Sequence, residues 1–125
     1  MEQTLFVGIV VSDPLISHDI AGIFAFWRAG SVCRVFGSID ALRALPPNDF
    51  NPGLVFIAAT RAGYLDVGPK DFLWLQQRAV ITLDVKENTH FPHWRHLTRP
   101  FTQEQVIQAA QQLLKPEAVN QSRTG

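Results

Sequence analysis

Residues 52–63 read PGLVFIAATRAG, and this stretch decides how the rest of the chain is interpreted. Its apolar run, Leu54–Ile57, follows Pro52-Gly53 and ends in two alanines and a polar turn. A short, nearly continuous apolar run between turn residues is typical of a strand covered on both faces, as in a parallel sheet. Open sheets of this kind carry their chemistry at the carboxyl ends of strands, so the pair Ala58-Ala59 needs an explanation.

Strand-like and helix-like segments alternate along the whole chain. The apolar runs that predict strands are 4–11, 31–36, 53–59, 79–83 and a shorter one around 96–98. The segments that predict helices open at Asp13-Pro14, span 38–45 and 70–78, and begin again at Thr102. This alternation predicts a single α/β domain with a parallel sheet over residues 1–116, followed by a polar and disordered tail at 117–125.

Two of the expected helices carry capping signals at their first residues. Asp13 can cap the helix that Pro14 opens, because proline is pre-set for the first helical turn. The sequence Thr102-Gln103-Glu104-Gln105 fits a capping box at the start of the last helix.

Composition excludes several classes of protein. The 125 residues are 46% apolar and 18% charged, which is typical of a globular chain. Eleven basic and eleven acidic residues give zero net charge, so we expect no direct binding of nucleic acid. Cys33 is the single cysteine and excludes an internal disulfide. No signal peptide or membrane-length apolar run is visible, and we expect a soluble cytoplasmic protein.

Three segments, taken in order, resemble the receiver domain of two-component response regulators. They are Val10–Ile16 (VVSDPLI), Pro52–Ala58 (PGLVFIA) and His96–Phe101 (HLTRPF). The resemblance covers roughly residues 5–114. It implies a flavodoxin-like, receiver-like three-layer sandwich, with a five-stranded parallel sheet of strand order 2-1-3-4-5.

The same resemblance implies a phosphorylation pocket that has lost its chemistry. Ala58 stands at the position of the phosphoacceptor aspartate, and Val11 and Ser12 stand at the acidic pair that holds Mg²⁺. Because Mg²⁺ requires oxygen ligands in near-octahedral order, the retained Asp13 alone does not supply such a site. We therefore expect a degenerate receiver, or pseudo-receiver, that is not an enzyme and uses no cofactor or metal.

Two further pocket positions also depart from the family pattern. The fourth-strand Ser/Thr falls on Leu83, although a shift of one residue would offer Thr82. Arg99 replaces the lysine, and it either pairs with Asp13 across the pocket or points into solvent. The following Pro100 is expected to have a cis peptide bond by resemblance.

The 15 residues between Leu83 and Arg99 are too few for a full helix with its loops. The resemblance therefore implies that the fourth helix of the family is shortened or missing and that the usual output surface is remodelled. Apolar side chains that one buried face cannot hold suggest an interaction surface. The candidates are Phe26, Trp74, Leu75, Phe91 and Trp94.

Two classes of function stay open. The first is a phosphorylation-independent interaction module in signal transduction. Its partners would be a signalling kinase, a phosphotransfer protein, a transcription regulator or a second copy of the chain. The second is a flavodoxin-like protein that binds a small ligand at the carboxyl edge of the sheet, or a metal through His90, His93 and His96. Pro92 argues against a helix that would align these histidines.

Overall fold

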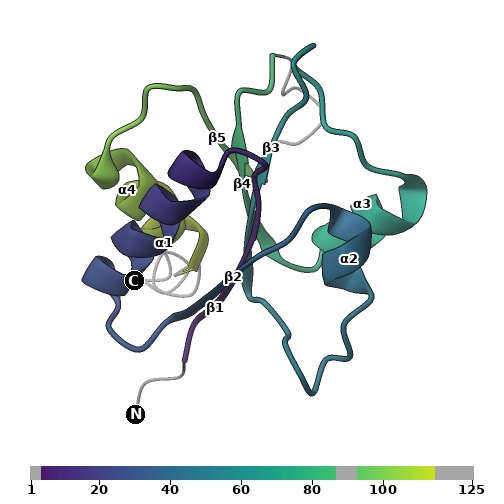
Figure 1. Ribbon diagram of the computed structural model, residues 1–125, viewed down its shortest axis with the longest axis horizontal. Coiled ribbons are helices and arrows are strands. Elements are labelled where there is room, and N and C mark those ends of the chain that lie inside the picture. The colour runs from purple at the N-terminus through teal and green to yellow at the C-terminus, as the bar shows by residue number, and fades with distance from the viewer. Residues whose placement is uncertain (1–3, 87–92, 115–125) are drawn as a thin grey trace, which may run out of the picture.

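The computed structural model describes residues 4–86 and 93–114, which form one sheet between two layers of helices (Figure 1). The strands are parallel and lie in the order β2-β1-β3-β4-β5. Their bounds are β1 Phe6–Val10, β2 Val32–Val35, β3 Leu54–Ala58, β4 Ala79–Leu83 and β5 Arg95–Leu97. The predicted fold class and strand order are therefore confirmed.

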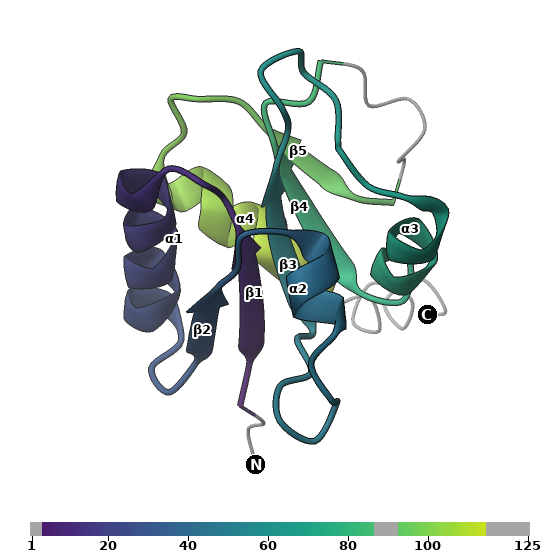
Figure 2. The ribbon, with the colours of Figure 1, turned by 45° about the vertical axis from the view of Figure 1, so that its right-hand side comes forward.

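Two helices cover each face of the sheet (Figures 1 and 2). Helices α1 (Pro14–Trp27) and α4 (Gln103–Leu114) lie on one face. Helices α2 (Ile39–Arg43) and α3 (Pro69–Leu75) lie on the other. This arrangement follows from right-handed crossovers, which place successive helices on opposite sides where the strand order reverses.

The central strand β3 shows why its sequence is apolar throughout. Leu54 and Phe56 belong to the core under α1 and α4, whereas Val55 and Ile57 belong to the core under α2 and α3. All four side chains are at most 3% exposed. Alternate side chains point to opposite faces of a strand, so a strand between two helical layers needs apolar residues at every position.

Both predicted helix caps are present. The Leu15 amide donates to Asp13 Oδ1 over 2.9 Å, which fixes the start of α1. The Thr102 amide donates to Gln105 Oε1 (2.9 Å), and the Gln105 amide donates to Thr102 Oγ1 (3.1 Å), which completes the capping box before α4.

The predicted helix at 70–78 differs from the observed one, because α3 begins at Pro69 and ends at Leu75. The Arg78 side chain accounts for the early end. Its Nη1 donates to the Trp74 carbonyl over 2.9 Å, so a side chain takes the place of the next helical turn.

The connection between β4 and β5 contains the segment in which a shortened fourth helix was expected. Its described residues, 84–86 and 93–94, are not helical. Residues 87–92 lie outside the described part of the chain, as does the tail predicted at 117–125. Within the described ranges, no helix has the length and apolar character needed to cross a membrane.

Candidate functional site at the carboxyl edge of the sheet

A small pocket opens at the carboxyl edge of the sheet, where the strand order reverses between β1 and β3. Its volume is about 230 Å³. It is lined by Val10, Ser12, Gly37, Ser38, Ile39, Ile57, Ala58, Ala59, Thr60 and Asp66. Ligands bind at this reversal point in many open α/β sheets, so the pocket is where chemistry would be sought.

Two of the seven predicted pocket residues, Ser12 and Ala58, line this pocket together. Ala58 closes β3 and contributes only a methyl group beside an exposed Ser12. Val11 is 4% exposed and packs in the core under α1 and α4, so its side chain is part of the fold and not of the pocket.

Asp13 does not face this pocket, because its carboxylate caps α1 as described above. Thr82, the alternative offered by a one-residue shift, also lies elsewhere. It is fully buried, and its Oγ1 is 2.6 Å from His96 Nδ1. Leu83 pairs with Ala58 in the β3–β4 register and packs with Ala58 in the core under α1. The alternation along β4 therefore turns Thr82 to the opposite face of the sheet.

Arg99 pairs with Asp84 and not with Asp13. Arg99 Nε lies 2.6 Å from Asp84 Oδ2, and the Arg99 amide donates to Asp84 Oδ1 over 2.9 Å. The Asp84 amide in turn donates to the Leu97 carbonyl, which continues the β4–β5 pairing past the strand ends. The expected cis bond between Arg99 and Pro100 is present.

Asp84 was not among the predicted site residues, and its pairing with Arg99 was not predicted. A signal for it exists, because Asp84 directly follows the fourth strand and Arg99 comes two residues after the fifth. Adjacent parallel strands bring such positions together at one edge. Asp84 has a left-handed backbone (φ 67°), a conformation that aspartate tolerates better than most residues.

The loop that follows β3 is held against the end of β4. The Ala59 amide donates to the Leu83 carbonyl and the Lys86 amide donates to the Gly63 carbonyl, each over 2.8 Å. Gly63 has φ 93°, and a Cβ there would overlap the Lys86 side chain. Within the described residues, Thr60 Oγ1 in this loop is buried without a hydrogen-bond partner.

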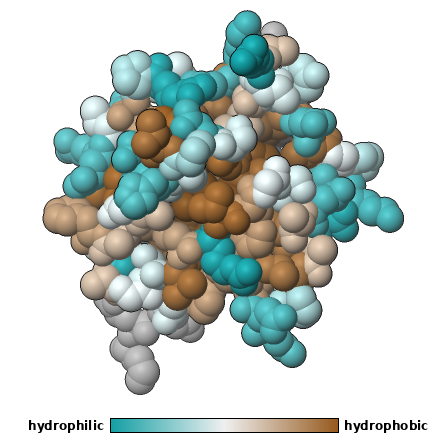
Figure 3. Space-filling view, viewed as in Figure 1, coloured by the Kyte–Doolittle hydropathy of each residue, from teal (hydrophilic) through white to brown (hydrophobic). Residues whose placement is uncertain are grey.

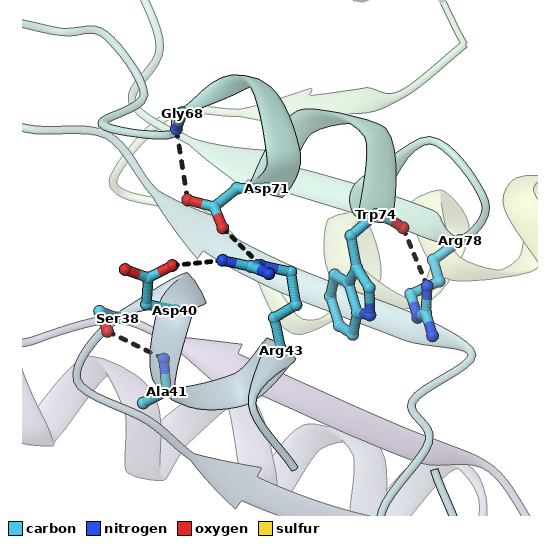
Figure 4. A network of polar contacts seen from close by, with 8 residues as sticks. All are labelled: Ser38, Asp40, Ala41, Arg43, Gly68, Asp71, Trp74 and Arg78. Carbon is cyan, nitrogen blue, oxygen red and sulfur yellow. Dashed lines mark hydrogen bonds and ion pairs between the residues drawn. The ribbon is translucent and has the colours of Figure 1, made fainter. Parts of the chain in front are cut away.

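A second, larger pocket of about 600 Å³ adjoins the first one and lies between α2 and α3. Its lining includes Asp40, Arg43 and Asp71. Figure 4 shows Arg43 between the two carboxylates: Nε donates to Asp71 and Nη2 to Asp40, each over 2.8 Å. The sequence reasoning missed this network, since no spacing rule links Arg43 on α2 to Asp71 on α3.

The environment of Asp71 shifts its pKa. Burial acts to raise the pKa of the Asp71 carboxyl, but hydrogen bonds from Arg43 and from the Gly68 amide outweigh it. The pKa of Asp71 therefore lies below its ordinary value. Asp71 is ionised at neutral pH and joins α3 to α2 as one half of an ion pair.

Solved structures with the same fold come from bacterial signalling proteins. A response regulator CheY-like protein from Mesorhizobium loti matches with a TM-score of 0.69 at 20% identity, over 87% of this chain and 98% of that one. The signal receiver domain of a putative LuxO repressor protein from Vibrio parahaemolyticus matches with a TM-score of 0.65 at 13% identity, over 98% and 99%. The chain has the response-regulator receiver fold.

A third similar structure is NtrX from Brucella abortus in complex with ADP, with a TM-score of 0.67 at 19% identity. The match covers 98% of this chain but only 29% of NtrX, so the receiver fold is a minor part of that protein. No family model matches the sequence, and a search of curated proteins finds no match.

On this receiver fold, the predicted interaction surface is only partly exposed. Phe26 on α1 is 74% exposed, as predicted. Leu75 (0%) and Trp94 (6%) are buried, so the prediction was wrong for both. Phe91 lies outside the described residues.

Leu75 and Trp94 are buried because of contacts between elements that cannot be predicted from the sequence pattern of one element. The Trp94 ring packs on Phe72 of α3 with centroids 5.9 Å apart, and Leu75 faces the core under α2 and α3. In the run 72–75 the exposed side chain is Leu73 (63%). Trp74 is half-buried, because the Arg78 guanidinium lies 3.7 Å above its ring.

The histidines of the predicted metal alternative are only partly described. His93 is exposed, and His96 uses Nδ1 for its contact with Thr82. His90 lies outside the described residues. In the ranges 4–86 and 93–114, no three His, Cys, Asp or Glu side chains are grouped to hold a metal ion.

Proposed function

We propose that this chain is a phosphorylation-independent receiver-fold module that acts in signal transduction by binding protein. The observation that carries the proposal is the side chain that ends β3. Ala58 offers a methyl group at the carboxyl edge, where the resemblance to receivers expects the phosphoacceptor carboxylate. A methyl group has no oxygen to accept a phosphoryl group.

The surroundings of Ala58 support the same proposal. A Mg²⁺ site requires carboxylate or phosphate oxygens around the reacting group. Of the two positions of the family's acidic pair, Ser12 supplies a hydroxyl beside Ala58, and Val11 is buried outside the pocket. Asp66 is the single carboxylate among the described lining residues. Asp13 is engaged as a helix cap and Arg99 is engaged with Asp84, so neither charge is directed at Ala58.

The module works through its outer surface in this proposal and does not itself catalyse a reaction. Its partners are a signalling kinase, a phosphotransfer protein, a transcription regulator or a second copy of the chain, in a cytoplasmic setting. Receiver folds in the similar structures come from response regulators, which supports a signalling role over an unrelated one.

The experiment is incubation with acetyl phosphate and Mg²⁺, followed by intact-mass measurement. The expected result is no added phosphoryl group in the wild type. Ala58→Asp is the matched variant, and we expect it to stay unmodified as well, because positions 11 and 12 still lack carboxylates. Phosphorylation of the wild-type chain would refute the proposal.

A second function is favoured by one observation, the pocket at the strand reversal. Its lining residues include Ser12, Ser38, Thr60 and Asp66, which could hydrogen-bond a small polar ligand. Its volume of about 230 Å³ is below the range usual for cofactor and drug-sized ligands. Ligand-induced changes in the amide resonances of Ser38 and Thr60 would establish this alternative.

A further inference from the structure

The outer face of α1 carries two large apolar side chains that are exposed. At 100° per residue, Leu15, Asp19, Gly22 and Phe26 fall within an arc of about 60°. Leu15 is 76% exposed and Phe26 is 74% exposed. Helix α1 contains no lysine or arginine. Asp19 places a charge within this arc, but two large exposed apolar side chains on one helix face are typical of a surface that binds a partner.

A pocket lies beside the first turns of the same helix. Its volume is about 480 Å³, and it is lined by Ile16, Asp19, Arg99, Pro100 and Phe101. Figures 1 and 2 both show the beginning of α1 next to the loop that leads from β5 into α4. Ile16 and Phe101 pack against the core and form an apolar floor, and Asp19 and Arg99 place opposite charges at the rim.

The exposed aromatic ring and the pocket are therefore on one helix at a fixed spacing. Phe26 lies seven residues, or about 10 Å, beyond Asp19, and ten residues, or about 15 Å, beyond Ile16. Two copies that pack with α1 antiparallel about a two-fold axis place each Phe26 at the pocket of the other copy. One two-fold axis thus buries both exposed rings and fills both pockets. This self-complementarity points to a second copy as the occupant.

The middle of the helix permits the close approach that this packing needs. The two α1 helices would cross near Gly22, which is exposed and lies between the pocket and Phe26. A Cβ added at Gly22 would meet nothing within 4 Å outside the helix backbone, so no other described part of the chain covers the helix there. Small residues at a crossing point bring helix axes closer and increase contact between the flanking side chains.

We propose that the protein self-associates through α1, with Phe26 of each copy seated in the pocket formed by Ile16, Asp19, Phe101 and their neighbours in the other. The inference rests on the proposed function, because it names a second copy as the protein partner. One pair of helix faces buries less than the roughly 800 Å² per partner of a standard interface. The dimer is therefore weak, with a dissociation constant of about 10–100 μM.

Sedimentation velocity from about 5 μM to 1 mM tests the proposal. The wild type shifts from monomer to dimer over this range, and Phe26→Ala weakens association at least tenfold. Leu73→Ala is the matched control, because Leu73 is similarly exposed (63%) but lies on α3 across the sheet. Gly22→Leu adds a side chain into open space on the monomer and also prevents the dimer. Thermal unfolding checks that each variant is folded.

A wild type that stays monomeric at 1 mM, or a dimer that Phe26→Ala leaves unchanged, overturns the proposal. Mixed isotope labelling then tests the geometry, with intermolecular NOEs expected between the Phe26 ring and the Ile16 methyl groups. NOEs that place Phe26 against another surface would contradict it. The absence of self-association would not change the result expected with acetyl phosphate. The two experiments therefore distinguish failure of the α1 dimer from failure of the proposed function.

Discussion

At the scale of single residues, the polar side chains expected in a phosphorylation pocket have structural partners instead. Asp13 accepts the Leu15 amide, Thr82 contacts His96 and Arg99 is bound to Asp84. Each contact gives the side chain a structural role that does not involve a phosphoryl group or a metal ion. Substitutions can therefore separate a structural role from a role in phosphate chemistry.

Asp13 gives the clearest such test. Asparagine caps helices about as well as aspartate, whereas alanine costs about 0.5–2 kcal/mol. We predict that Asp13→Asn changes the free energy of unfolding by less than about 0.5 kcal/mol and that Asp13→Ala lowers it by about 1 kcal/mol. Urea denaturation measures both. Equal losses in the two variants would show that the charge of Asp13, and not its cap, is what matters.

Asp71 gives the molecule a dependence on acid pH. Its pKa is lowered in the folded state, so in acid the unfolded chain binds more protons than the folded one. The stability from the Arg43–Asp71 pair is present above the ordinary pKa of 3.8 and is lost as pH falls through the lowered value.

We predict that Asp71→Asn lowers the free energy of unfolding by about 1–3 kcal/mol at pH 7 and reduces its fall below pH 4. Asp40→Asn is the control, because Asp40 binds the same Arg43 from a side chain that is 74% exposed. An exposed pair contributes about 0–1 kcal/mol. Urea denaturation at pH 7, 4 and 3 makes the comparison, and equal losses in both variants would contradict the assignment.

At the scale of elements, loop geometry decides how the carboxyl edge is built. The β3–α3 loop turns at Gly63 and lies against Lys86 at the end of β4. We predict that Gly63→Ala lowers stability by about 1–3 kcal/mol, because φ is positive and the new methyl group meets the Lys86 side chain. In Gly53→Ala the methyl group meets nothing within 4 Å, so this control stays near neutral. Thermal melts measure both, and similar melting temperatures would argue against a rigid loop.

The sequence predicts elements well where one element's own pattern is sufficient. Five strands and their order follow from apolar runs and a resemblance, and β4 was expected over the residues it occupies, Ala79–Leu83. Contacts between elements that are distant in the sequence are harder to predict. Nothing in Phe72-Leu73-Trp74-Leu75 says which side faces inward, and the packing of Trp94 on Phe72 links α3 to the start of β5. The Asp84–Arg99 pair differs, because both residues follow adjacent parallel strands and this placement is visible in the sequence.

At the scale of the whole molecule, we propose that the receiver fold is separate from the receiver switch, because the fold is present without the groups for phosphorylation. The sheet, the two helical layers and the cis Arg99–Pro100 bond are present. Where a phosphoryl site is expected, the carboxyl edge holds Ala58 and Ser12, whereas Asp13, Thr82 and Arg99 are engaged in other contacts. The exposed helix α1 is then the better place to look for binding.

The most direct test of this separation is an NMR titration with beryllofluoride and Mg²⁺, which together imitate an aspartyl phosphate. We predict no change in the amide resonances of Ala58, Asp84 and Arg99 at millimolar beryllofluoride, because no carboxylate ends β3. Mg²⁺-dependent shifts at these residues that saturate with beryllofluoride would show that the carboxyl edge binds the phosphoryl mimic, and they would contradict the proposed loss of the switch.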